Sequence, residues 1–353
     1  MKIFLMRHKN LMIVSIIAII VIYLQYEEYA SASKKSLVYF CSGDTHCNGW
    51  GDRLKGIVTG YVISKMIGRD FKIHMPNRPC DLTQTLQPAV IDWKPNANEI
   101  KPEHLFIKGM GVRASKKQLD LVEKPEFFPP IVQYLSNIHF LPRLRSYDTF
   151  PESLSDSIDA DIYRKAYNDL FKLTPLLNRT ISELLPSNDQ QLHCIQLRFT
   201  EAGSPTGAFQ SKFLTDALPD LLRFMYKISK GRPSKFFVAS NGIHAIEEGK
   251  RTFGKNFLET PGTPSHIDRA SQNPDCSGLT KIILDTEILK RCDSLILSDC
   301  GVSFIAAYLR EKDDVNLYCI NYSRHLGRNI GELVVKCNRS DIPNFYIKGH
   351  RTW

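Results

Sequence analysis

The chain has 353 residues, with 46 lysines and arginines against 37 aspartates and glutamates and a formal net charge of +9 at pH 7. This length exceeds one ordinary hydrophobic core and suits two domains. The positive charge suits a phosphate-bearing partner or an anionic membrane surface. No stripe of interleaved basic and aromatic residues indicates a nucleic-acid partner, so none is expected.

The first predicted element is an apolar segment at residues 11–24, interrupted by a single serine. Basic residues precede it and acidic residues follow it, namely Lys2, Arg7 and Lys9, then Glu27 and Glu28. The positive-inside rule then predicts a cytosolic tail at 1–10, a signal-anchor transmembrane helix at 11–26 and a stem at 27–35 before a luminal domain. Ala30-Ser31-Ala32 also matches a cleavage site, so a cleaved signal peptide is the alternative. Either alternative sends the chain into the secretory pathway, and we expect a single-pass protein of the Golgi or endoplasmic reticulum membrane.

A strand–helix–strand unit follows the stem. Residues 36–41 form an apolar run that predicts a buried strand, and residues 52–66 carry apolar side chains at helical spacing. Gly68 ends this helix, and residues 70–75 predict the next strand. A βαβ unit of this kind predicts a parallel, doubly wound sheet.

The middle of the chain has a less regular pattern. Residues 76–150 contain many prolines and two short apolar runs, near Leu105 and His139, and predict long loops. Residues 156–185 become helical, which suits a connection between two halves. We expect a first domain at 36–180 and a second at 181–353.

A second series of strands and helices fills residues 192–321. Strands are expected at 192–198, 236–239, 294–297 and 315–321, and helices at 214–229, at 245–251, from 284 to the turn at 292, and from near 304. This alternation predicts a second doubly wound sheet. The fold class is therefore α/β, with two Rossmann-like halves that face each other across a ligand cleft.

The loop Ser298–Ser303 is made of small residues and joins a buried strand to a helix that starts near Phe304. Free backbone N–H groups and the positive end of the helix dipole converge at such a loop. The segment therefore predicts a site for the phosphates of a ligand. The Ser303 hydroxyl either contacts a phosphate or caps the helix.

Nine cysteines lie beyond residue 40: Cys41, Cys47, Cys80, Cys194, Cys276, Cys292, Cys300, Cys319 and Cys337. In an oxidising lumen they predict a few disulfides and at least one leftover thiol. Cys41 and Cys47 bracket a loop with His46, so zinc is an alternative, but no second pair at ligand spacing follows and a disulfide is favoured. Three glycosylation sequons fit a luminal domain: Asn178, Asn321 and Asn338.

Four segments together resemble one enzyme family. They are Asp285–Ala306 (D-x-x-I-L-x-x-x-D-x-x-I and S-F-x-A), Cys194–Glu201 (against H-x-R-R-x-D), Phe236–Asn241, and Gly49–Leu54 (against G-x-G-N-R-L). Their order resembles the GDP-fucose-dependent fucosyltransferases, which include the protein O-fucosyltransferases, the α1,6-fucosyltransferases and the nodulation fucosyltransferase. The chain departs from the family's patterns at Asp52, Gln196, Phe199 and Glu201, where the family has Asn, His, Arg and Asp.

The resemblance implies the GT-B fold and transfer of fucose with inversion from GDP-fucose to a glycan or glycoprotein, with no metal or other cofactor. It implies a donor site made of Gly51, Arg53, Arg198, Ser240, Asn241, Asp285, Ser303 and Phe304. Arg198 follows an apolar strand and would hold the diphosphate, because a guanidinium matches phosphate oxygens. The alternative is a salt bridge to Glu201 or another loop carboxylate.

The roles of the acidic residues stay open. Asp52 or Glu201 is the candidate base, although Asp52 would otherwise cap its helix. Asp285 has Ile282, Ile288 and Leu289 as helical neighbours, so it either pairs with a basic loop or faces the nucleotide.

The sequence also allows a metal-binding signature and two alternative functions. Asp159-Ala160-Asp161 matches the D-x-D metal signature of another glycosyltransferase fold, but it opens a helix, where acidic residues are ordinary. The alternative functions are a luminal transferase with another activated donor, such as a sulfotransferase, and a non-catalytic binding protein. Gln196 and Phe199 keep the second alternative open.

Overall fold

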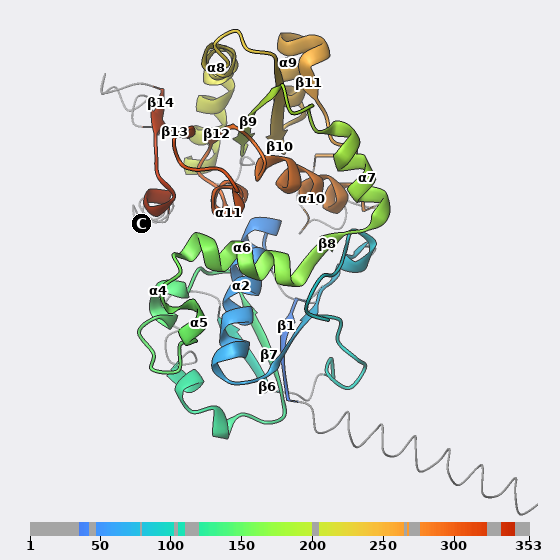
Figure 1. The fold of residues 1–353 in the computed structure, drawn as a ribbon, viewed down its shortest axis with the longest axis vertical. Coiled ribbons are helices and arrows are strands. Elements are labelled where there is room, and N and C mark those ends of the chain that lie inside the picture. The colour runs from blue at the N-terminus through green and yellow to red at the C-terminus, as the bar shows by residue number, and fades with distance from the viewer. Residues whose placement is uncertain are drawn as a thin grey trace, which may run out of the picture.

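The computed structural model describes residues 35–41, 47–77, 80–101, 105–109, 120–199, 205–264, 267, 276–322 and 333–342. They form two α/β halves stacked along the long axis, with the C-terminal half uppermost in Figure 1. The predicted tail and anchor and the stem up to residue 34 lie outside these residues, as does Glu201. Within the described residues, no helix has the length and apolarity needed to cross a membrane.

The N-terminal half is built on a four-stranded parallel sheet in the order β2-β1-β7-β6, with β1 Ser36–Phe40, β2 Asp70–His74, β6 Leu105–Gly109 and β7 Ile131–Ser136. In its register, Ser36 pairs with Asp70 and Ile131. Helix α2, Trp50–Met66, packs on this sheet and ends before Gly68, which takes a left-handed φ of 61°. The predicted first βαβ unit is confirmed, with the helix beginning two residues earlier than expected.

Residues 76–150 contain more regular structure than the predicted loops. Besides β6 and β7, short antiparallel pairs join β3, Pro76–Asn77, to β4, Cys80–Asp81, and β5, Leu86–Pro88, to β8, Phe171–Leu173. The remaining elements are 3-10 helices at Leu82–Gln84, Asp120–Glu123 and Pro125–Phe127 and the short helix α4, Leu141–Leu144, and a second short helix, α5 Glu152–Ser155, follows this segment. Strands of two or three residues leave no periodicity that a sequence can reveal.

The connection between the halves is not one helical stretch, as expected, but two helices with β8 between them. Helix α6 spans Asp159–Leu170 and α7 spans Pro175–Leu184. Pro175 lacks an N–H and disfavours the helical conformation at the residue before it, so the chain is extended at Thr174 and a new helix starts. The predicted domain boundary at residues 180 and 181 falls inside α7.

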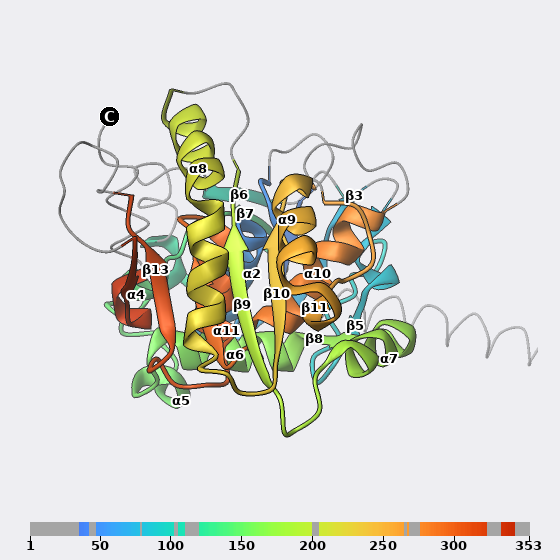
Figure 2. The ribbon, with the colours of Figure 1, turned by 90° about the horizontal axis from the view of Figure 1, so that it is seen from above.

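The C-terminal half has a six-stranded sheet in the order β11-β10-β9-β12-β13-β14, in which only β14 runs antiparallel. The strands are β9 Gln191–Leu197, β10 Ser234–Ser240, β11 Phe257–Leu258, β12 Ser294–Leu297, β13 Leu317–Ile320 and β14 Val334–Lys336. Helices α8 (Pro205–Ile228) and α9 (Ile243–Phe253) lie on one face, and α10 (Ser277–Leu289) and α11 (Gly301–Leu309) on the other (Figure 2). Two 3-10 turns, Gly254–Asn256 and Arg339–Asp341, complete the half.

Each sheet reverses its strand order at one point. In the C-terminal sheet the chain runs from β9 outward to β10 and β11, then returns to the other side of β9 as β12. In the N-terminal sheet β1 lies between β2 and β7. In open α/β sheets ligands bind beyond the carboxyl ends of the strands at such a reversal. The ends of β9 and β12 are therefore the place to look for a ligand site.

The two halves share one continuous core. A single cluster of buried side chains runs from the N-terminal sheet through α2 and α6 to α10 and α11. At its centre His139, Tyr163, Phe304 and Tyr308 form an aromatic group with centroid distances from 4.2 to 5.9 Å. The disulfide between Cys80 and Cys276 adds a covalent link between the halves.

Four disulfides join Cys41 to Cys47, Cys80 to Cys276, Cys194 to Cys292 and Cys319 to Cys337. Cys300 remains a free, buried thiol. The expectation of several disulfides with a leftover thiol is confirmed, and the zinc alternative at Cys41 and Cys47 is wrong.

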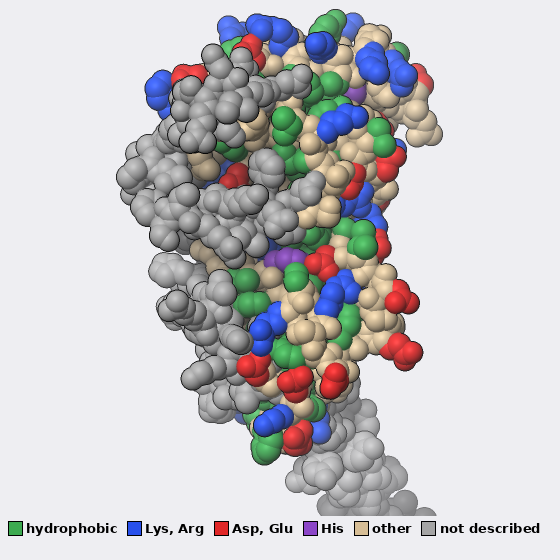
Figure 3. Space-filling view, turned by 90° about the vertical axis from the view of Figure 1, so that its left-hand side faces the viewer, with side chains coloured by type: hydrophobic (Ala, Val, Ile, Leu, Met, Phe, Trp, Pro, Cys, Tyr) green, Lys and Arg blue, Asp and Glu red, His purple; other side chains and the backbone are tan. Residues whose placement is uncertain are grey.

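The surface drawn in Figure 3 carries both signs of charge. Lys and Arg side chains lie among Asp and Glu side chains over both halves. On the described part of this face, the net positive charge is not gathered into one basic stripe.

Candidate functional site

Arg198 lies where the strand order reverses, directly after the last residue of β9. Its side chain is half-buried, and its backbone N–H donates to Ser298 Oγ at 3.0 Å, at the end of β12. Within the described part of the chain, no hydrogen bond or ion pair engages its guanidinium group. The geometry thus presents a charged fork at the carboxyl edge of the sheet, as the sequence predicted.

Ser240, the last residue of β10, and Asn241, which follows it, form hydrogen bonds to the backbone around them. The Asn241 amide forms a double bridge to Phe199: Oδ1 accepts the Phe199 N–H at 2.9 Å and Nδ2 donates to the Phe199 carbonyl at 2.6 Å. Ser240 is 8% exposed, and its Oγ accepts the Gly242 N–H at 3.0 Å. The Asn241 amide thus extends the pairing of β9 with β10 beyond the strand ends, and the predicted contact of both residues with base or ribose stays a prediction.

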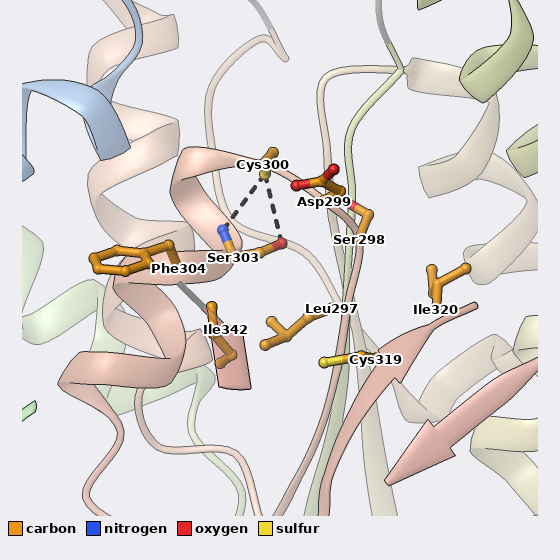
Figure 4. Close-up of a pocket in the computed structure, with 9 residues that line it drawn as sticks. All are labelled: Leu297, Ser298, Asp299, Cys300, Ser303, Phe304, Cys319, Ile320 and Ile342. Atoms are coloured by element: carbon orange, nitrogen blue, oxygen red, sulfur yellow. Dashed lines mark hydrogen bonds between the residues drawn. The ribbon is translucent and has the colours of Figure 1, made fainter. Parts of the chain in front are cut away.

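Helix α11 begins at Gly301, three residues before the expected start, so Ser303 is not its N-cap. Cys300 takes that position, and its Sγ accepts the Ser303 N–H at 3.4 Å (Figure 4). The Ser303 side chain is 3% exposed and its hydroxyl donates to Gln196 Oε1. In this structure the hydroxyl is therefore bonded inside the protein and not presented to a phosphate. Burial raises the pKa of the Cys300 thiol, against the opposing effect of its bonds to Ser303.

Phe304 also turns inward. It is 2% exposed and stacks on Tyr308 with centroids 4.2 Å apart, inside the aromatic group between the halves. The helix turns this ring towards α6, so the side chain belongs to the core, and the predicted part of Phe304 in donor binding at the helix start stays a prediction.

A small cavity lies beside these residues. Its lining comes from the end of β12, the start of α11, β13 and the 3-10 turn near residue 342 (Figure 4): Leu297, Ser298, Asp299, Cys300, Ser303, Phe304, Cys319, Ile320 and Ile342. Its volume of about 20 Å³ suits one water molecule and not a nucleotide. A ligand at the strand ends would therefore lie outside this cavity.

The N-terminus of α2 meets the N-terminus of α11 at Gly51 and Gly301. A Cβ atom added to Gly51 would lie 2.5 Å from the Val302 nitrogen and closer still to the Gly301 carbonyl group. Two positive helix ends, one from each half, thus meet beside the strand ends. Glycine at position 51 allows this backbone contact, and the predicted part of Gly51 in donor binding stays a prediction.

Asp52 and Arg53 flank that contact. The Asp52 carboxylate pairs with Lys55 Nζ at 2.6 Å in the first turn of α2, where the helix dipole favours an acid. Arg53 is 2% exposed, and its Nε donates to the Asn48 carbonyl at 2.9 Å. Asp52 keeps a partly exposed carboxylate at the junction of the halves, whereas Arg53 ties α2 to the preceding loop. Their predicted roles in chemistry and donor binding stay predictions.

Asp285 is buried in a polar group of its own. It is 2% exposed, its Oδ1 lies 3.3 Å from Lys281 Nζ, and it accepts a hydrogen bond from Thr260. Burial raises the pKa of Asp285, and Lys281 offsets part of that rise. Asp285 is thus held inside the protein, but by a basic residue of its own helix and not by the basic loop of the structural alternative. The partner is Lys281, four residues earlier on the same helix, and this i, i+4 spacing of opposite charges is visible in the sequence.

The D-x-D segment has ordinary structural partners. Asp159 accepts from Arg145 and lies 3.1 Å from His139 Nε2, and Asp161 pairs with Arg164. Burial alone would raise the pKa of Asp159, but His139 and Arg145 lower it below its usual value. Within the described residues, no group of three His, Cys, Asp or Glu side chains is arranged to hold a metal ion.

His139 is a residue of this junction that sequence reasoning did not select. It follows β7 at the carboxyl edge of the N-terminal sheet, with Nδ1 3.0 Å from the Tyr163 hydroxyl and its ring 5.2 Å from that of Phe304. Its partners come from α6 and α11, so these contacts appear only when the two halves pack together. Of the sequons, Asn178 and Asn338 are exposed and Asn321 is half-buried.

No protein-family model matches the sequence, and the sequence has no significant match among curated proteins. Solved structures do match the fold. Arabidopsis thaliana FUT1, in a mutant form complexed with GDP, superposes with a TM-score of 0.57 at 13% identity, over 81% of this chain and 70% of that one. The NodZ alpha-1,6-fucosyltransferase soaked with GDP-fucose gives 0.54 at 12% identity, over 86% and 99% of the chains. Fucosyltransferase NodZ from Bradyrhizobium gives 0.53 at 11% identity, over 86% and 99%.

The chain has the fold of these fucosyltransferases. The resemblance that four short motifs indicated is therefore confirmed at the level of the fold. In this fucosyltransferase fold, the segments around Arg198 and Ser298 end neighbouring strands, and the segment at Gly51 meets them from the other half.

Proposed function

We propose that this protein is a glycosyltransferase of the GT-B fold that transfers fucose from GDP-fucose to a hydroxyl group of a glycan or glycoprotein. The observation that carries the proposal is the position of Arg198, half-exposed at the reversal point of the C-terminal sheet. Two of the matching fucosyltransferases were solved with GDP or soaked with GDP-fucose, which supports a guanine nucleotide as the ligand of this edge.

The reaction is a direct displacement. The acceptor oxygen forms a bond to the anomeric carbon of fucose while the bond from that carbon to the β-phosphate oxygen breaks, and GDP leaves with the electron pair. The acceptor proton passes to a base, for which Asp52 and Glu201 are the candidates, and the anomeric centre inverts. The Arg198 guanidinium and the two helix N-termini at Gly51 and Gly301 would stabilise the growing negative charge of the diphosphate.

A donor-release assay on the full-length protein tests the proposal. We expect GDP to be released from GDP-fucose and not from GDP-mannose, and no UDP from UDP-sugars, with the activity unchanged by EDTA. Release from a UDP-sugar, or loss of activity in EDTA with recovery on manganese, would contradict the donor or the metal independence. Binding of GDP-fucose without turnover on any acceptor would favour the non-catalytic alternative.

We also propose that residues 11–26 anchor the protein in the Golgi or endoplasmic reticulum membrane with the domain in the lumen. The exposed sequon residues Asn178 and Asn338 support glycosylation there. Endoglycosidase should increase the mobility of the expressed protein on a gel, and a tag at Met1 should stay open to protease in intact vesicles. An unglycosylated, cytosolic product would refute this topology.

A further inference from the structure

The side-chain amide of Gln196 gathers three donors near the end of β9. Gln196 is 4% exposed, and its Oε1 accepts from Ser298 Oγ at 2.8 Å, from Cys300 Sγ at 3.1 Å and from Ser303 Oγ. These donors stand 102, 104 and 107 residues further along the chain. One buried oxygen thus holds the end of β9 to the segment that joins β12 to α11.

The hydrogen bonds that Ser298 and Cys300 already accept determine that the oxygen of the Gln196 amide, and not its nitrogen, faces them. Ser298 Oγ accepts the Arg198 N–H at 3.0 Å, and Cys300 Sγ accepts the Ser303 N–H at 3.4 Å. The hydroxyl proton of Ser298 and the thiol proton of Cys300 are therefore free to be donated, and they need an acceptor. The amide oxygen of Gln196 can accept them, whereas its amide nitrogen can only donate. Because an unmade hydrogen bond at a buried position is costly, this group of bonds specifies one geometry.

The Ser298 hydroxyl transmits that geometry to Arg198, since it lies between Gln196 Oε1 and the Arg198 N–H. At the next residue, the Asn241 amide holds both the N–H and the carbonyl of Phe199. Side chains therefore fix the backbone on both sides of Arg198, while its guanidinium stays half-exposed. A binding group needs such support to keep its direction.

We propose that Gln196 is a positioning residue that acts through Arg198, fixing by way of Ser298 the direction in which the guanidinium meets a diphosphate. The inference rests on the proposed function and deepens it. Glutamine at the family's histidine position then supports the nucleotide site through its own hydrogen bonds, and it does not indicate that the site has been lost.

A double-mutant cycle on the full-length protein tests this positioning role. Gln196→Met keeps the length of the side chain but removes the acceptor, and it should weaken GDP binding roughly tenfold, the loss of about one well-made buried hydrogen bond. In an Arg198→Ala background the same change should alter GDP affinity by less than about twofold, because nothing remains to be positioned. Gln191→Met, at the other end of β9 and half-exposed, is the matched control and should leave GDP affinity unchanged.

The outcomes separate the inference from the proposed function. Equal losses of GDP affinity in both backgrounds, or no loss in either, would overturn the positioning role, because a merely structural residue does not depend on Arg198. Normal GDP binding by Arg198→Ala alone would instead remove the proposed nucleotide site and the inference with it. If Gln196→Met does not fold, Ser298→Ala enters the same cycle, since it removes only the hydroxyl between Gln196 and Arg198.

Discussion

Replacing Arg198 with lysine should lower the turnover of GDP-fucose roughly ten- to a hundredfold. A charge-assisted hydrogen bond contributes about 1.5–3 kcal/mol, and lysine keeps the charge while losing the two-pronged geometry. Each factor of ten in rate corresponds to about 1.4 kcal/mol in the barrier. Arg198→Ala should lose more, and GDP affinity should fall in parallel. Turnover and GDP binding measured on both variants check this expectation.

Arg223 offers a matched control for this substitution. It is exposed on α8 and pairs with Asp220, and neither residue belongs to the segments that follow β9 and β12. Arg223→Lys and Arg223→Ala should leave turnover and GDP affinity unchanged. Because the Arg198 side chain is half-exposed, neither Arg198 variant should lower the melting temperature by much. An Arg198→Ala protein that binds GDP normally but melts early would make the arginine a structural residue.

Replacing Gly51 with alanine should destabilise the whole protein by about 3 kcal/mol or more. Alanine in a helix normally stabilises relative to glycine by about 0.5–1 kcal/mol, so a freely exposed site would respond with the opposite sign. Here the new methyl group would run into the backbone of Gly301 and Val302, which cannot move aside as a side-chain end can. We expect the melting temperature to fall by roughly 4 °C or more, measured at one heating rate.

The reciprocal change supplies the comparison. A Cβ on Gly301 would lie 3.0 Å from Asp52 Oδ1, the end of a side chain that can rotate, and 3.3 and 3.4 Å from the backbone atoms Asp52 N and Gly51 C. These distances are longer than those at Gly51, so Gly301→Ala should cost clearly less than Gly51→Ala. Gly51→Ala should also reduce turnover, because it separates the two helix ends beside the proposed diphosphate site. Equal stability of the two variants, or a rise in melting temperature for Gly51→Ala, would contradict the close contact between the halves.

Much of the fold could be predicted because its signals are local. The strand at 294–297 is found at the predicted bounds, and the strand and helix of the first βαβ unit begin within two residues of expectation. An apolar run before a small-residue loop identifies a buried strand and its carboxyl end without knowledge of neighbours. Arg198 could be selected for the same reason, since it directly follows such a run.

The differences between the predicted and observed contacts of Asn241, Ser303 and Phe304 share one cause. Their places at strand ends and helix starts predict donor contacts, whereas the structure turns these side chains towards partners elsewhere in the protein. Asn241 binds the backbone of Phe199, 42 residues away, and Ser303 binds Gln196, 107 residues away. Which partner a polar side chain meets depends on strand order and helix packing, which local patterns do not contain.

By itself, then, the sequence determined an α/β chain of two parallel sheets, the positions of the strand ends and the candidate arginine, because periodicity and loop composition act over a few residues. Only the tertiary structure decided that β9 and β12 are neighbours, that Gln196 joins them, and that Gly51 touches Gly301. It also decided the pairing of Cys80 with Cys276 across 196 residues. These contacts form only when distant segments are brought together by burial of a common core, so their geometry belongs to the packed protein and not to any stretch of its sequence.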